Sequence, residues 1–129
     1  MYKDGHIRQI LEDLVQTSCF ELGLNPNDFP VKHMGLVKQQ GEYKYGWYLE
    51  IQNFTNLHMV KQSQNDRFWR YTFRSVMFTD ENEPTLMVMK WTPSMGSVED
   101  NENIFQGKYL KDSSKFIQLL ISTLMDRSK

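Results

Sequence analysis

Two apolar patterns divide this sequence: a spacing of three to four residues at both ends, and a spacing of two in the middle. The spacing at the ends is typical of one face of an α-helix, so it predicts helices over about 5–22 and 113–127. We expect Asp4 to cap the first helix, Gly23 to end it, and Asp112 or Ser113 to cap the last one. The two helical stripes consist of Ile7, Ile10, Leu11, Leu14, Val15, Ser18 and Leu22, and of Phe116, Ile117, Leu120, Ile121, Leu124 and Met125.

The alternation in the middle is typical of strands that bury one face. The polar stretch 92–111 shows little periodicity, and we expect it to be a surface loop. Helices and strands with one apolar face each predict a single domain, 1–129, of α+β class. In this two-layer sandwich, an antiparallel meander of four or five strands carries the N- and C-terminal helices on one face. The predicted strands cover 31–38 (the weakest), 43–52, 57–61 (short), 67–79 and 85–91.

Composition narrows the class of protein. With a single cysteine, Cys19, the chain cannot form an internal disulfide, which favours the reducing cytoplasm or nucleus. No apolar run approaches the ~20 residues of a membrane span, so we expect no membrane partner. The net charge of −1 argues against a generally cationic nucleic-acid binder. Basic residues dominate 32–74 and acidic residues 75–106, so either neighbouring groups neutralise each other in the fold or the surface is polarised.

The sequence contains no pattern that carries catalysis or binds a metal. His6, His33 and His58 are scattered, without metal-ligand spacing and without a second cysteine. Cys19 lies near the C-terminal end of the first helix, where the helix dipole does not activate a thiol. Nucleophile elbows and phosphate-binding glycine loops are absent from the sequence. We therefore expect no enzyme, no metal and no cofactor.

The segment 67–74 carries the most informative pattern. Its alternation puts Arg70 and Arg74 on the strand face opposite Trp69, Tyr71 and Phe73. If the helices cover the aromatic face, these arginines line the open face of the sheet, with Arg67 at its edge and Tyr48 on the neighbouring strand. Arginine beside tyrosine favours a protein interface, and the same pair can also stack on bases and neutralise phosphates of a single-stranded nucleic acid. A third interpretation is a solvated face on which Arg70 or Arg74 pairs with Glu50.

The expected loop offers a second contact surface through Met95, Glu99 and Asp100. The hypothesis that follows is a non-catalytic protein-interaction domain, an adaptor or a subunit of a larger assembly. Its partner is a protein, and single-stranded nucleic acid on the same face is the alternative. A small-ligand pocket walled by Tyr45, Trp47, Trp69 and Tyr71 also stays open. A homodimer stays open as well, through an edge strand at 31–38.

Overall fold

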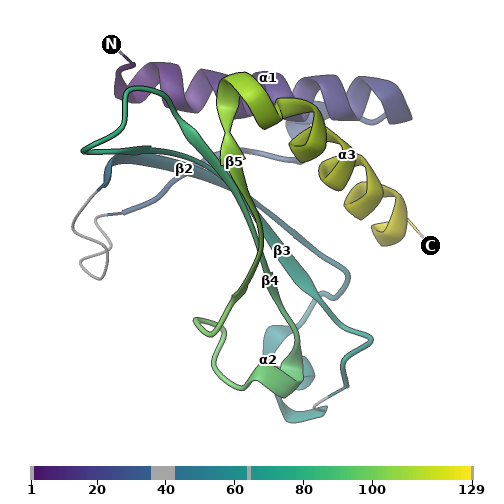
Figure 1. The fold of residues 1–129 in the computed structure, drawn as a ribbon. Helices are drawn as coiled ribbons and strands as arrows, with labels where there is room; N and C mark the ends of the chain where they lie inside the picture. The colour runs from purple at the N-terminus through teal and green to yellow at the C-terminus, as the bar shows by residue number, and fades with distance from the viewer. Residues whose placement is uncertain (1, 36–42, 64, 129) are drawn as a thin grey trace.

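The computed structural model describes residues 2–35, 43–63 and 65–128, with the backbone alone at 43 and 44 (Figure 1). The strands form one antiparallel sheet in the order β1-β2-β3-β4-β5. This meander with helices at both ends confirms the predicted α+β class. The elements are α1 (Asp4–Leu22), η1 (Pro26–Asp28), β1 (Lys32–His33), β2 (Tyr43–Gln52), α2 (Leu57–Ser63), β3 (Arg70–Phe78), β4 (Thr85–Trp91), η3 (Pro93–Met95), β5 (Glu102–Lys108) and α3 (Tyr109–Arg127).

The main core lies between the sheet and the pair α1 and α3, which both cover the same face (Figure 1). The ring of Phe73 meets that of Phe116 edge to face, with centroids 5.5 Å apart, and so joins β3 to α3. Trp47, Trp69 and Tyr71 pack half-buried against this core, as the alternation predicts. The other sheet face is therefore the one that these two helices leave uncovered.

The stretch 57–61, predicted as a strand, is the helix α2. Its start is fixed by Asn56, whose Oδ1 accepts hydrogen bonds from the backbone N–H groups of His58 (3.0 Å) and Met59 (3.4 Å). Only Val60 of this helix is buried. The apolar pattern of 57–61 is therefore too short to distinguish a strand from a helix of one or two turns.

The stretch 92–111, predicted as a loop, contains the fifth strand. β5 pairs antiparallel with β4, and the register shifts between Val88 and Met89. Because β5 is an edge strand that places mainly Phe105 against the core, its sequence lacks the alternation of a half-buried strand. The final helix also begins four residues earlier than predicted, at Tyr109. Asp112 supports this start from inside the first turn, where its Oδ2 accepts the backbone N–H of Lys108 at 2.9 Å.

Two predicted boundaries shift. Lys3, not Asp4, is the N-cap of α1, and the Asp4 carboxylate instead accepts the indole N–H of Trp47 at 2.8 Å. β3 begins at Arg70 rather than at 67, because the side chain of Asn53 bonds the preceding backbone at two points. The weak strand at 31–38 is present as the edge strand β1, Lys32–His33, and positions 36–38 of that prediction lie outside the described residues.

Candidate functional site

The uncovered face of the sheet carries a line of side chains that crosses all five strands. Residues directly opposite each other in an antiparallel pair point to the same face. Lys32 faces Tyr48, Tyr48 faces Arg74, Arg74 faces Met87, and Met87 faces Gln106. We call these five residues the transverse row. The predicted neighbours Tyr48 and Arg74 are thus brought together, with Lys32 and Met87 beside them.

One end of this face is covered by a second, smaller hydrophobic cluster. Trp91, at the end of β4, is fully buried there between α2 and the segment that follows β4 (Figure 1). Met95 lies half-buried in this cluster instead of projecting from a free loop. The open face is therefore limited to the exposed Lys32 and Gln106 and the half-buried Tyr48 and Arg74 of the transverse row, because Met87 between them is buried. The cluster consists of Phe54, Val60 and Trp91, with Leu57, Phe68, Met95 and Val98 packed against them.

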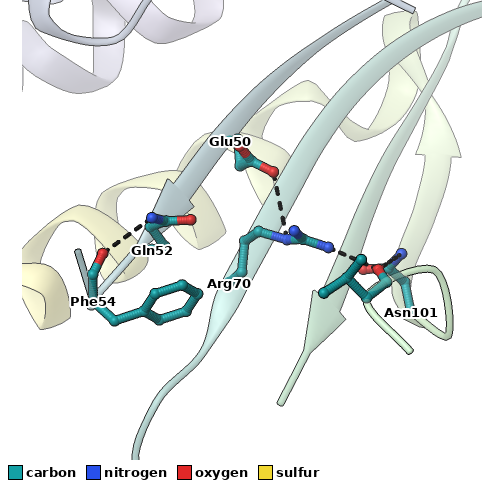
Figure 2. Close-up of polar contacts among 6 residues, drawn as sticks. Glu50, Gln52, Phe54, Arg70 and Asn101 are labelled. Atoms are coloured by element: carbon teal, nitrogen blue, oxygen red, sulfur yellow. Dashed lines mark hydrogen bonds and ion pairs between the residues drawn. The ribbon is translucent and has the colours of Figure 1, made fainter. Parts of the chain in front are cut away.

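Arg70 is turned inward and connects the sheet to the segment 96–101 (Figure 2). One of its terminal nitrogens donates a hydrogen bond to the carbonyl of Val98 at 2.7 Å, and its Nε lies 3.4 Å from a carboxylate oxygen of Glu50. The guanidinium also lies 5.6 Å from the ring centroid of Trp91. Its side chain is only 12% exposed. The pair of Arg70 with Glu50, one of the two pairings in the solvated-face alternative, is present, although Arg70 is not solvated. We call this set of contacts the Arg70 clamp.

Asn101 adds to the clamp, because its Nδ2 donates to the same Val98 carbonyl at 3.2 Å (Figure 2). A second clamp holds the start of the segment. The Asp66 carboxylate accepts the backbone N–H of Ser94 at 3.0 Å and its hydroxyl at 2.7 Å. These bonds to the charged form hold the pKa of Asp66 below its ordinary value. The segment 92–101, which we call the clamped segment, is thus fastened at Ser94 by Asp66 and at Val98 by Arg70.

The remaining predicted site residues lie around these clamps. Arg67 is exposed just before β3, with its guanidinium 5.8 Å from the ring centroid of Phe68. Glu99 and Asp100 are exposed on the clamped segment, next to Val98. The predicted residues therefore form two groups. Tyr48 and Arg74 lie on the open face, and the other five, Arg67, Arg70, Met95, Glu99 and Asp100, lie at or beside its covered end.

Sequence reasoning missed Lys32 and Asp66 as members of these groups. Lys32 joins the transverse row through the pairing of β1 with β2, and nothing local in a two-residue strand sets that register. Asp66 binds a segment 28 residues further along the chain. In the sequence, Asp66 belongs to a polar turn, and nothing in that turn indicates the contact with Ser94.

A metal site, a reactive thiol and a small-ligand pocket are three further kinds of site that a chain of this composition can form. Among the described residues, no group of three or more His, Cys, Asp or Glu side chains is placed to hold a metal ion. Cys19 is buried in the main core, and burial, with a smaller contribution from the charge of Asp28, raises the pKa of its thiol. Three surface depressions lie along α1, and none of the four predicted pocket residues, Tyr45, Trp47, Trp69 and Tyr71, lines any of them.

Comparison of the chain with protein-family models, with curated proteins and with solved structures gave no match. In the part of the chain that the structure describes, no helix has the length and apolar character needed to cross a bilayer.

Proposed function

We propose that this chain is a non-catalytic protein-interaction domain, an adaptor or a subunit of a larger assembly, whose transverse row contacts the partner. The observation that carries the proposal is the register that places Lys32, Tyr48 and Arg74 side by side on the face that α1 and α3 leave uncovered. The single cysteine, buried and unpaired, supports action in the cytoplasm or nucleus.

The chemistry of the row suits a protein surface. Tyrosine and arginine give a large contact area with oriented hydrogen bonds, and they are enriched among the residues that dominate binding energies. Met87, next to Arg74, is buried at 7% exposure, so the contact surface of the row consists of Lys32, Tyr48, Arg74 and Gln106. Two cationic side chains on either side of Tyr48 favour a partner segment that carries carboxylates.

The clamped segment provides a second contact at the covered end of the face. Glu99 and Asp100 are exposed there, and Arg70 fixes the backbone next to them. A partner that spans the face would meet the cations of the row at one end and these carboxylates at the other. Such an arrangement fixes the orientation of the partner more than it adds affinity.

The experiment is affinity capture from a lysate with tagged protein, in which the bound material is assayed for protein and for nucleic acid. We expect one defined protein to be retained after nuclease treatment, and to be lost with Arg74→Glu and with Tyr48→Ala. The matched control is Lys115→Glu, which makes the same change of charge at an exposed position on α3. This variant should retain the protein partner.

Capture that is unchanged in the folded Arg74→Glu variant would contradict the proposed site. Retention of nucleic acid, lost with Arg74→Glu and falling steeply with salt, would replace the proposal with the single-stranded nucleic-acid alternative, because phosphate contacts release counterions.

A further inference from the structure

The outward side of α1 carries a stripe of exposed residues. His6, Gln9, Asp13, Thr17 and Phe20 follow each other at three or four positions, so they lie along one line of the helix. This line flanks the buried stripe that packs on the sheet, and it runs next to Ile10. It is also remote from the transverse row, since α1 covers the other sheet face (Figure 1).

The stripe has a projecting aromatic side chain at one end and a depression at the other. Phe20 is 84% exposed, the most exposed of the large apolar side chains in the described chain. The depression has a volume of about 450 Å³, and a second one of about 360 Å³ shares Asp13 with it and reaches Phe20. The first depression is lined by Tyr2, His6, Gln9, Ile10, Asp13 and Tyr109.

Hydrogen bonds hold the rim of the depression in place. The ring Nδ1 of His6 accepts the backbone N–H of Lys3 at 3.0 Å, and Gln9 donates to the Asp13 carboxylate at 2.8 Å. Tyr2 and Tyr109 pack against the main core, and Ile10 belongs to it. A side chain that enters the depression therefore meets groups that are already ordered, which lowers the entropic cost of binding.

We propose that a second copy of this chain docks on α1, antiparallel, so that Phe20 of each copy enters the depression of the other. The spacing fits a two-fold axis near Asp13. Phe20 lies seven residues after Asp13 and His6 seven residues before it, about 10 Å along the helix in each direction. Each copy then offers the same surface to the other, as a two-fold dimer requires.

Charge complementarity supports this occupant. In the antiparallel arrangement, Glu21 of one copy lies at nearly the same height, and on the same flank of the helix, as Lys3 of the other. Both are exposed, and neither takes part in an ion pair within the described residues. Asp13 opposes association, because the Asp13 carboxylates of the two copies approach each other near the two-fold axis. One helix face is also a small interface, so the dimer is weak, with a micromolar or higher dissociation constant.

Sedimentation velocity over a series of concentrations tests the dimer. Wild type should show reversible association, and Phe20→Ala should weaken it about tenfold or more. Met59→Ala, which removes another exposed apolar side chain (66% exposed, on α2), is the matched control and should leave it unchanged. A wild type that stays monomeric throughout, or association that Phe20→Ala leaves intact, would overturn the proposal.

A charge exchange tests the arrangement of the two copies. Lys3→Glu and Glu21→Lys should each weaken association, and the double variant should restore it. The two positions are eighteen residues apart on one helix, roughly 27 Å, so recovery requires a contact between copies. Asp13→Asn should strengthen association. Additive losses in the double variant, or no gain with Asp13→Asn, would contradict the antiparallel register. Partner capture by the open face should be unaffected by Phe20→Ala, which separates this proposal from the proposed function.

Discussion

At the scale of single residues, Arg70 shows how a side chain on the uncovered face can serve the fold. Its guanidinium bonds the Val98 carbonyl and pairs with Glu50, while its side chain is almost removed from water. Arg70→Ala removes both contacts, and we expect a loss of about 1–3 kcal/mol in the free energy of unfolding. We also expect faster hydrogen exchange at the Asp100 amide, which bonds Ser97 within the clamped segment. Arg67→Ala, at an exposed position nearby, should change neither the free energy of unfolding nor the exchange rate of the Asp100 amide. If Arg67→Ala had the same effects as Arg70→Ala, the role of the clamp would be contradicted.

Asp66 makes a prediction about pH at the same scale. Its pKa is lowered in the folded protein by the bonds from Ser94, so its contribution to stability is present above the pKa of the unfolded chain. That contribution is lost as the pH falls through the lower, folded pKa. The amide resonance of Ser94, followed by NMR, should therefore titrate with a midpoint below that of an ordinary aspartate. In Ser94→Ala, which loses the hydroxyl donor, the pKa of Asp66 should rise, as read from its own carboxyl carbon resonance. A wild-type midpoint at the ordinary value would contradict this contact.

At the scale of elements, long apolar patterns in the sequence predict helices and strands correctly, whereas short or irregular apolar patterns do not. α1 and β2 and their inward faces follow from spacing, because each buries one stripe or face, whereas β4 follows from its run of apolar residues, which are buried on both faces. α2 and β5 were missed, because each buries very few side chains and is held mainly by tertiary contacts. The same limit applies to the candidate site: the pair Tyr48 and Arg74 follows from alternation, whereas the inward turn of Arg70 depends on a segment 28 residues away.

The junction of β5 and α3 gives a prediction at this scale. A Cβ atom on Gly107 would lie 2.6 Å from the Cβ of Asp112, the residue that bonds the backbone N–H of Lys108 at the start of the helix. Gly107→Ala should therefore displace Asp112 and cost about 1–3 kcal/mol, measured by thermal or denaturant unfolding. Asp112→Ala alone should cost about 1 kcal/mol through loss of the hydrogen bond. The double variant should cost less than the sum of the two, because both single changes lose the same hydrogen bond and Asp112→Ala removes the carboxylate atoms near position 107, although its Cβ remains. Strict additivity would contradict this account.

At the scale of the whole molecule, the sheet separates two surfaces. α1 and α3 cover one face, while α2 and the clamped segment cover one end of the other (Figure 1). In the transverse row, Lys32 and Gln106 are exposed, Tyr48 and Arg74 are half-buried, and Met87 is buried. The proposed partner and the proposed second copy therefore occupy opposite sides of the molecule. One chain can bind both at once, and variants on one side are expected to leave the other side unchanged.

The most direct test of the proposed function places a photoreactive phenylalanine analogue at position 48, in the transverse row. The control places the same analogue at position 118, an exposed position on α3 on the other side of the sheet. After irradiation in a lysate, we expect a discrete protein adduct from position 48 that resists nuclease, and none of the same mass from position 118. The absence of a protein adduct at position 48, the same adduct from both positions, or an adduct that nuclease removes would contradict the account.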